Sequence, residues 1–160
     1  AAFDIAAKLK WPNDVVADGR KISGILSELD SASQTVVLGI GLNVNVTGED
    51  LASAGLDQTA TSMRISRDRE FNLGEVRTRL TGCLQTALDE VAKKGLSWVA
   101  SEWAHHDWLA GHVIEIQGAQ GTVSGVYAGM DNAGALCLVD PAGTRHVLSA
   151  GDVTRLRRAG

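Results

Sequence analysis

The chain has 160 residues, 44 % of them hydrophobic and 21 % charged, which is the balance of an ordinary globular protein with a buried core. Its 15 Lys and Arg residues are outnumbered by 19 Asp and Glu residues, and the net charge of −4 argues against a general nucleic-acid or membrane-surface binder. No apolar stretch approaches the roughly 20 residues of a membrane span, and no signal-peptide pattern is visible. We therefore expect a cytoplasmic protein in which Cys83 and Cys137, which lack metal-ligand spacing, are buried free thiols.

Strand-like runs dominate the first 46 residues. The first run, residues 9–17, is broken at Trp11 and Pro12, and the turn signal Asp18-Gly19 leads into a second run at residues 21–29. The third run, residues 35–46, is almost continuously apolar and β-branched, which is typical of a strand covered on both faces. The opening residues resemble the end of a helix that has no beginning, so we expect a fragment of a longer protein.

Helical patterns follow these strands. Residues 47–69 are polar, and we expect loops with one short helix there. The clearest helix begins after Asn72, which can cap it with Glu75 three residues later, and its apolar residues recur every three or four positions. Two lysines and a glycine end this helix by residue 95. A shorter helix starts near Ser97 and carries two tryptophans that we expect to anchor the core.

The pattern changes near Ala110, where we place a boundary between a domain of residues 1–110 and a domain of residues 111–160. Five short strand candidates follow, separated by Gly- and Asp-containing turns: 112–117, 121–127, 135–139, 145–149 and 152–156. Closely spaced strands with such turns are typical of a small barrel. The predicted fold class is α+β, with a partial mixed β-sheet and helices followed by a small β-barrel.

The first predicted hairpin brings two opposite charges together. With the turn as a two-residue loop, Val16 faces Lys21, and the next pair is Val15 with Ile22. Side-chain alternation then makes Asp14 and Lys21 diagonal neighbours on one face, with Cβ atoms roughly 7–8 Å apart. That gap could accommodate a phosphate or its metal ion, with Lys21 neutralising negative charge and Asp14 holding a cation or a ribose hydroxyl. Two solvated positions on a half-exposed hairpin would explain the same charges.

The third strand run carries Gly39 and Gly41 and leads to Asn43. Glycine inside an apolar strand often marks the close approach of a ligand or of another backbone. Asn43 offers a donor and an acceptor suited to an adenine edge, although tight packing before a turn explains the pattern equally well. The spacing is not that of a dinucleotide-binding loop. Residues 105–107 and the arginines of 155–158 are interpreted as solvent-exposed surface.

Four motifs stand in order along residues 10–43: KWPND at 10–14, Lys21 seven residues after Asp14, GIL at 24–26 and GIGLN at 39–43. Together they resemble the central part of biotin–protein ligases, for which the pairing of Trp-Pro-Asn-Asp with Lys-x-x-Gly-Ile-Leu is highly specific. The resemblance continues through ATSM at 60–63 and the long helix. Residues 111–156 resemble the family's C-terminal SH3-like barrel, so essentially the whole chain is covered.

The resemblance implies that biotin and ATP, with Mg²⁺, form biotinyl-5′-adenylate, and that biotin is then transferred to one lysine of a carrier domain. It implies a catalytic Lys21 that contacts the biotin carboxyl and the adenylate phosphate. The implied biotin-binding residues lie on the glycine-bearing strands: Lys21, Gly24, Ile25, Gly39 and Leu42. The implied ATP-binding residues flank them: Asn13, Asp14, Lys21 and Asn43. Asp14 is also the implied metal ligand.

The resemblance also implies partners and a departure from the family pattern. The expected partner is the biotin carboxyl carrier domain of acyl-CoA carboxylases; a homodimer is allowed, and no nucleic acid or membrane partner is expected. The family's Arg- and Gly-rich loop should lie upstream of Lys10, so we expect these 160 residues alone to be inactive. Two alternatives stay open: a non-catalytic fragment or pseudo-ligase binding module, and a lipoate-type acyl-adenylate ligase. Trp11-Pro12-Asn13-Asp14 and the barrel argue against the lipoate alternative.

Overall fold

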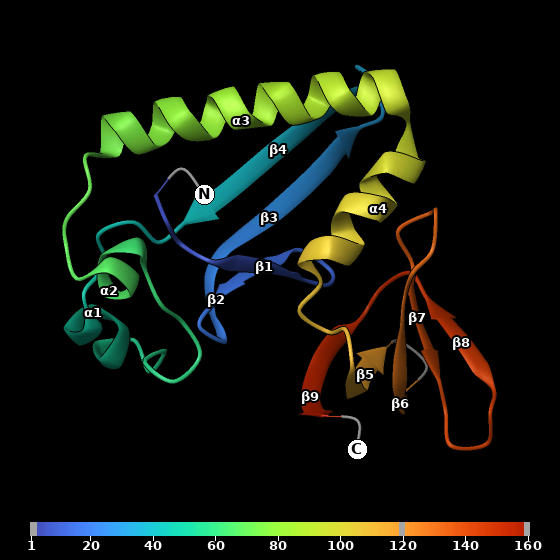
Figure 1. The fold of residues 1–160 in the computed structure, drawn as a ribbon. Helices are drawn as coiled ribbons and strands as arrows, with labels where there is room; N and C mark the ends of the chain where they lie inside the picture. The colour runs from blue at the N-terminus through green and yellow to red at the C-terminus, as the bar shows by residue number, and fades with distance from the viewer. Residues whose placement is uncertain (1–2, 119–120, 159–160) are drawn as a thin grey trace. The chain divides into compact units, whose positions relative to one another are not determined.

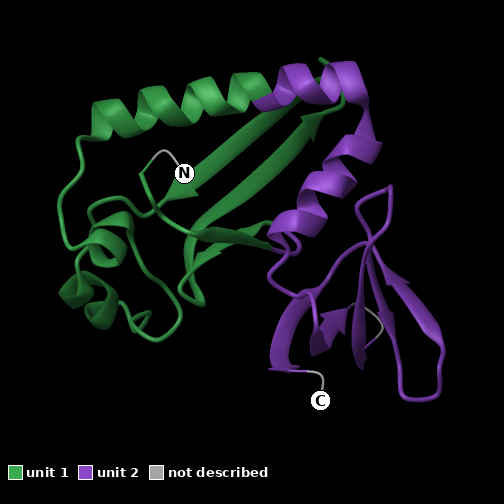
Figure 2. Ribbon diagram, in the orientation of Figure 1, with its two compact units in different colours: residues 1–9, 13–86 green, residues 10–12, 87–160 purple. Residues whose placement is uncertain are grey.

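The computed structural model describes residues 3–118 and 121–158. The chain forms two compact units: unit 1 consists of residues 1–9 and 13–86, and unit 2 of residues 10–12 and 87–160 (Figure 2). The elements follow one another along the chain (Figure 1) as β1 (Ala7–Lys10), β2 (Asp14–Ala17), β3 (Arg20–Asp30), β4 (Thr35–Leu42), α1 (Gly48–Ser53), α2 (Met63–Arg67), α3 (Leu73–Lys94), α4 (Leu96–His106), β5 (His112–Gly118), β6 (Gly121–Met130), β7 (Leu136–Val139), β8 (Arg145–Leu148) and β9 (Asp152–Arg158). This order confirms the predicted α+β class.

Unit 1 contains a four-stranded sheet in the order β1-β2-β3-β4. The predicted hairpin forms, with Val16 opposite Lys21. The predicted pairing of Val15 with Ile22 is wrong, because a bulge shifts the register and places Val15 opposite Ser23. Ile22 is the extra residue, and its buried side chain joins the core of this unit. The bulge therefore brings Asp14 opposite Gly24.

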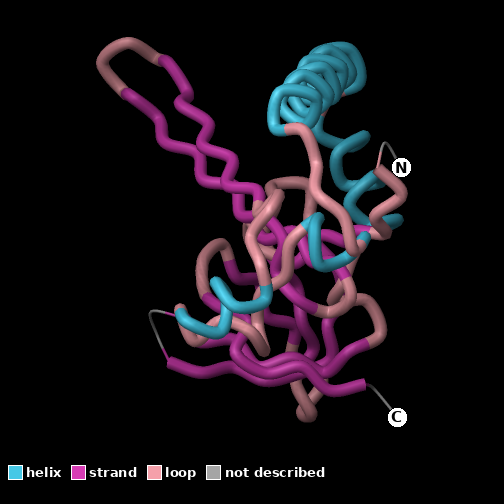
Figure 3. Tube along the Cα trace, turned by 90° about the vertical axis from the view of Figure 1, so that its left-hand side faces the viewer, coloured by secondary structure: helices cyan, strands magenta, loops and turns pink. Residues whose placement is uncertain are grey.

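β3 and β4 form a long antiparallel hairpin, in register from the Ser23–Leu42 pair to the Asp30–Thr35 pair. It extends as the twisted ribbon at the upper left of Figure 3. The prediction that residues 35–46 are covered on both faces is wrong, since Val36 and Val37 are 61 % and 60 % exposed. The strand also ends at Leu42, because the carbonyls of Asn43 and Val44 accept hydrogen bonds from the Met63 and Arg64 N–H groups instead of from a neighbouring strand.

Side chains cap the first turns of α1, α2 and α3, which satisfies N–H groups that have no partner within the helix, whereas α4 begins after Gly95 without a side-chain cap. Two short helices form within residues 47–69, where one was predicted, because Thr47 caps α1 and Ser62 caps α2. The predicted cap of α3 is confirmed, since the Asn72 Oδ1 accepts a 3.1 Å hydrogen bond from the Glu75 N–H. The predicted end of α3 at Gly95 is confirmed. Gly95 has a φ of +73°, which favours glycine, and it separates α3 from α4.

Unit 2 contains a five-stranded antiparallel sheet in the order β8-β7-β6-β5-β9. All five predicted strands are confirmed. The described pairings leave β8 and β9 at the edges, so closure into a barrel stays a prediction, and the predicted turn at 118–120 lies partly outside the described residues. The predicted boundary at Ala110 precedes β5, whereas the two compact units divide within α3.

A buried carboxylate ties the end of α4 to β6. The expectation that residues 105–107 are surface is wrong for Asp107, which is only 6 % exposed. Its two oxygens accept hydrogen bonds from the Leu109 N–H at 2.9 Å and from the Tyr127 hydroxyl at 2.6 Å, which is why it can be buried. Burial, and then the bond to Asp107, raise the pKa of Tyr127 well above its ordinary value.

Two further expectations concern thiols and membranes. Both cysteines are free, and Cys137 is buried as predicted, but Cys83 is exposed on α3, so the prediction of two buried thiols is half wrong. Val76 is the only buried residue of α3, so most of this helix, Cys83 included, lies outside the core. Among residues 3–118 and 121–158, no helix combines the length and the apolar composition needed to cross a bilayer.

Tyr127 is the only tyrosine of the chain, so its ionisation can be followed by ultraviolet absorbance. We expect the native phenol to stay protonated at about pH 11, while the urea-unfolded chain titrates near 10. Because its folded pKa is raised, stability is present below the unfolded value and is lost as pH rises toward the folded value. Tyr127→Phe should abolish this loss and cost about 1–3 kcal/mol at neutral pH, since it leaves the Asp107 carboxylate short of a donor. A native phenol that titrates near 10 would contradict the assignment.

Candidate functional site

The charged pair predicted from the sequence lies in unit 1, on neighbouring strands. Asp14 opens β2, and Lys21 is the second residue of β3. The Lys21 Nζ lies 2.5 Å from the Asp14 Oδ1, with the Lys21 side chain 50 % exposed and that of Asp14 20 % exposed. The predicted gap between these residues is therefore closed by their own side chains, because the long lysine stem reaches across to the carboxylate. The ammonium remains accessible from solvent on one side.

Gly24 makes room for this ion pair. A Cβ built on Gly24 would lie 3.1 Å from the Lys21 Nζ, 3.2 Å from its Cε and 3.7 Å from the Asp14 Oδ1. The ammonium thus rests against bare backbone, and any side chain at this position would push it aside. Gly24 was predicted as a ligand-contacting residue; its contact with the head of Lys21 was not foreseen, because it depends on the bulge.

The backbone of Lys21 is held from the other side by residues 59–61. Its N–H donates to the Thr59 carbonyl and its carbonyl accepts from the Thr61 N–H, both at 2.8 Å. These bonds form a parallel bridge between Lys21 and Ala60. The ATSM motif supported the family resemblance but received no role from the sequence, since nothing local to residues 60–63 indicates that they pair with β3. Their role here is to fix the strand from which the lysine extends.

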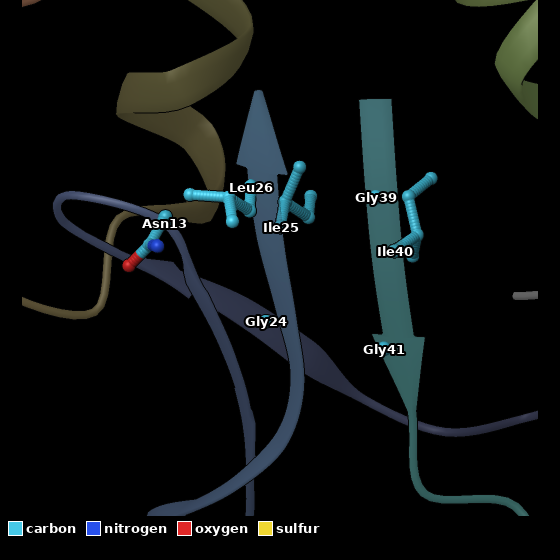
Figure 4. Close-up of a pocket in the computed structure, with 7 residues that line it drawn as sticks. All are labelled: Asn13, Gly24, Ile25, Leu26, Gly39, Ile40 and Gly41. Atoms are coloured by element: carbon cyan, nitrogen blue, oxygen red, sulfur yellow. The ribbon is translucent and has the colours of Figure 1, made fainter. Parts of the chain in front are cut away.

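A hollow of about 530 Å³ lies beside the ion pair (Figure 4). Its lining comes from the β3–β4 pair and the residue before β2: Asn13, Gly24, Ile25, Leu26, Gly39, Ile40 and Gly41. Gly24 pairs with Gly41, and Leu26 pairs with Gly39. Cross-strand partners and alternate residues share a face, so these four positions and Asp14 lie on one face of the sheet. The floor of that face is largely bare backbone.

The chain's own packing does not require glycine at two of these positions. A Cβ on Gly39 would meet only the Leu26 carbonyl oxygen, at 3.7 Å, and one on Gly41 only the Gly24 carbonyl oxygen, at 3.9 Å. Both distances are ordinary van der Waals contacts, and neither glycine has a left-handed φ. Glycine weakens a strand, and internal packing does not account for its presence at these two positions.

Of the other residues predicted to bind ligands, two line the hollow and two do not. Ile25 and Asn13 line the hollow, and the Ile25 N–H donates to the Asn13 carbonyl at 2.8 Å. Leu42 does not reach it: Leu42 pairs with Ser23, one position out of phase with Gly41, and packs against the buried core of unit 1. Asn43 does not line it either, because its Nδ2 donates to the Thr61 carbonyl at 3.0 Å.

None of the described residues that line the hollow is acidic, and the carboxylate beside it is that of Asp14, which faces Gly24. In the part of the chain that the structure describes, no group of three or more His, Cys, Asp or Glu side chains converges as a metal site would. Mg²⁺ commonly uses one or two carboxylates together with substrate phosphates and water. Asp14 therefore fits a magnesium ion that arrives with a phosphate ligand, and the donor set does not fit a metal held by protein groups alone.

The chain is similar in sequence to known proteins. The model of the Biotin/lipoate A/B protein ligase family matches residues 3–45. The biotin–[acetyl-CoA-carboxylase] ligase of Mycobacterium tuberculosis is 36 % identical over 150 residues, which cover 93 % of this chain and 53 % of that protein. The bifunctional ligase/repressor BirA of Bacillus subtilis is 27 % identical over 152 residues, covering 93 % and 46 %. The chain thus spans about half the length of the curated relatives it matches.

The fold has a solved counterpart over nearly its full length. The biotin protein ligase of Aquifex aeolicus, solved in complex with biotin and ATP, superposes with a TM-score of 0.80 and 24 % identity. The match covers 99 % of this chain and 65 % of that one, and at this identity it shows the fold alone. The chain is therefore similar over residues 3–45 to the biotin/lipoate A/B protein ligase family, and over most of its length to proteins named biotin–[acetyl-CoA-carboxylase] ligase and bifunctional ligase/repressor BirA.

Proposed function

We propose that the hollow and the Lys21–Asp14 pair are the adenylation site of a biotin–protein ligase, which forms biotinyl-5′-adenylate and passes biotin to a carrier lysine. One observation carries the proposal: an accessible ammonium rests on Gly24 at the edge of a glycine-floored hollow that internal packing does not explain. Its volume of about 530 Å³ lies within the range of small-molecule sites. The names of the relatives support the same reaction.

The first step joins two anions. A biotin carboxylate oxygen attacks the α-phosphorus of ATP, the bond from that phosphorus to the bridging oxygen breaks, and pyrophosphate leaves. Negative charge concentrates on the oxygens around the α-phosphorus, so a fixed cation there stabilises the transition state. Lys21 supplies that cation, and Asp14 keeps its flexible side chain over Gly24 before the anions arrive.

The second step uses no further group of this site. The neutral amine of the carrier lysine attacks the acyl carbon of the adenylate, AMP leaves, and one proton is released. We assign the carrier to the biotin carboxyl carrier domain of acyl-CoA carboxylases and the location to the cytoplasm, where ATP and such carriers meet; a homodimer is compatible with this assignment.

The two substrates divide the site between them. The glycine floor and Ile25 receive biotin, whose planar ureido group can lie against bare backbone. Asn13 and Asp14, at the start of β2, face the nucleotide, and Asp14 would hold the Mg²⁺ that accompanies ATP and neutralise phosphate charge with it. Asn43 stays assigned to adenine by family resemblance, and Leu42 supports the floor from the core side.

Removing the cation tests the first step. We expect Lys21→Ala to slow adenylate formation by roughly 10²–10³-fold, the effect of losing one preorganised charge contact to a transition state. Single-turnover synthesis of labelled biotinyl-adenylate by the whole enzyme measures this rate. Lys8→Ala, a change at another lysine of unit 1, is the control and should leave the rate unchanged. An unaltered rate in the Lys21 variant would reject the assignment.

Displacing the cation without removing it gives a second test. In Gly24→Ala the new methyl group lies 3.1 Å from the Lys21 Nζ, so the ammonium must shift, and we expect adenylate formation to fall by at least about tenfold, or ~1.4 kcal/mol of barrier. The matched variant is Gly48→Ala, outside the lining of the hollow, whose methyl group meets no atom of the chain within 4 Å. We expect similar urea unfolding for both, and the rate difference should vanish if the position of Lys21 is irrelevant.

Filling the floor separates the two substrates. Gly39→Val introduces a side chain that the chain itself can accommodate, so we expect near-normal stability but strongly weakened biotin binding. ATP binding should change much less, because ATP is placed at the β2 side of the site. Calorimetric titration with each ligand measures both affinities, with lipoate as a comparison ligand. Equal loss of both affinities would indicate a damaged fold instead.

A further inference from the structure

Asn43 follows β4 and bonds to two other segments of unit 1. Its N–H donates to the Ile22 carbonyl at 2.9 Å, and its own carbonyl accepts from the Met63 N–H, also at 2.9 Å. Its side-chain Nδ2 donates to the Thr61 carbonyl at 3.0 Å. Backbone and side chain together therefore link the start of β3 to residues 61–63.

These bonds close a ring around the residue that carries the ammonium. The Thr61 N–H donates to the Lys21 carbonyl at 2.8 Å, and the Thr61 carbonyl accepts from the Asn43 side chain. The Asn43 N–H returns to Ile22, which a peptide bond joins to Lys21. A backbone held in a closed network loses more freedom than one held by a single contact. Ile22 is also the extra residue of the bulge, so the ring encloses the place where the register of β3 shifts.

The donor on Asn43 is difficult to replace, because the residue that it holds is buried. Thr61 is 0 % exposed, so water cannot take over the bond to its carbonyl if the side chain is lost. A buried carbonyl without a partner is unfavourable. Asparagine carries an N–H donor of the required reach, whereas aspartate has the same size and no donor. The ring therefore depends on the amide at position 43.

Asn45, two residues further along the chain, provides a matched comparison. Its Nδ2 donates to the Phe71 carbonyl at 2.8 Å, and its Oδ1 accepts from the Phe71 N–H at 2.9 Å. Phe71 lies in the buried core of unit 1, so loss of this amide also leaves buried backbone groups without their partner. Both bonds hold the segment before α3, which lies outside the ring. The chain therefore offers a lesion of the same kind, in the same unit, that spares the ring.

We propose that Asn43 is a positioning residue: by holding the Thr61 carbonyl it fixes the bulged start of β3, and so the direction in which the Lys21 side chain extends toward its ion pair. This role differs from the adenine contact that family resemblance implies, because it acts through the backbone of Lys21 before any ligand binds. The catalytic consequence rests on the proposed function, whereas the positioning does not.

Hydrogen exchange in the protein without ligands tests the positioning. Asn43→Asp keeps the size of the side chain and removes the donor, and Asn43→Ala removes the whole amide. The Thr61 amide, which bonds to Lys21, should exchange about five- to tenfold faster in both variants, the effect of ~1–1.4 kcal/mol from one lost hydrogen bond. In the control Asn45→Ala the Phe71 amide should exchange faster instead, with Thr61 unchanged. Unchanged exchange at Thr61 in the Asn43 variants, or a rise there matched by an equal rise at Phe71, would overturn the proposal.

Adenylate formation by the whole enzyme gives a second readout. A lost adenine contact would weaken ATP binding, so the rate is measured with ATP and biotin both saturating, where a pure loss of affinity has no effect. We expect this rate to fall about five- to tenfold in both Asn43 variants and to stay unchanged in Asn45→Ala. An unchanged saturated rate would overturn the proposal, and a fall in ATP affinity alone would then leave Asn43 as an adenine contact. Faster Thr61 exchange in a protein that binds neither biotin nor ATP would uphold the positioning and refute the proposed function.

Discussion

The contact between the Lys21 ammonium and the Asp14 carboxylate depends on a bulge, a glycine and a backbone bridge acting together. The bulge moves Asp14 one place along β3 so that it faces Gly24. Gly24 leaves open the volume that the ammonium occupies, and the bridge to Ala60 holds the strand beneath it. Each of these three features involves only a few residues. Without any one of them, the two charges would lie on the same face of the sheet but would not meet at the hollow.

The KWPND motif joins two tasks that lie in different units. Its tryptophan is a core residue of unit 2, whereas its asparagine and aspartate belong to the site in unit 1. The proline between the tryptophan and the asparagine reduces the number of backbone conformations available to this segment. The five residues of the motif are therefore contiguous in sequence but divided between the two units.

Much of unit 1 and all the strands of unit 2 could be predicted, because turns and helix caps are local signals. Asp18-Gly19 predicted the hairpin, and Asn72 predicted the start of α3. The bulge could not be predicted, since Ile22 leaves the alternation and packs into a core that includes residues 41 to 54 positions later. The same limit applies to Leu42, whose face depends on that register, and to Trp11, whose indole N–H donates to a carbonyl 123 residues away.

The candidate site is built from features that do little for stability. A half-exposed ion pair contributes about 0–1 kcal/mol, because water screens the charges and the lysine loses side-chain freedom. Glycine inside a strand costs roughly 0.5–1 kcal/mol relative to alanine, and three stand within two paired strands. The hairpin beside them also presents valines to solvent. Local rules of strand formation are broken here and kept in the core of unit 2, whose strands bury Ile114, Ile116 and Leu138. Such a difference between the two units is expected where strands expose their backbone to a ligand. These strands pack less well, and the ligand can approach the backbone more closely.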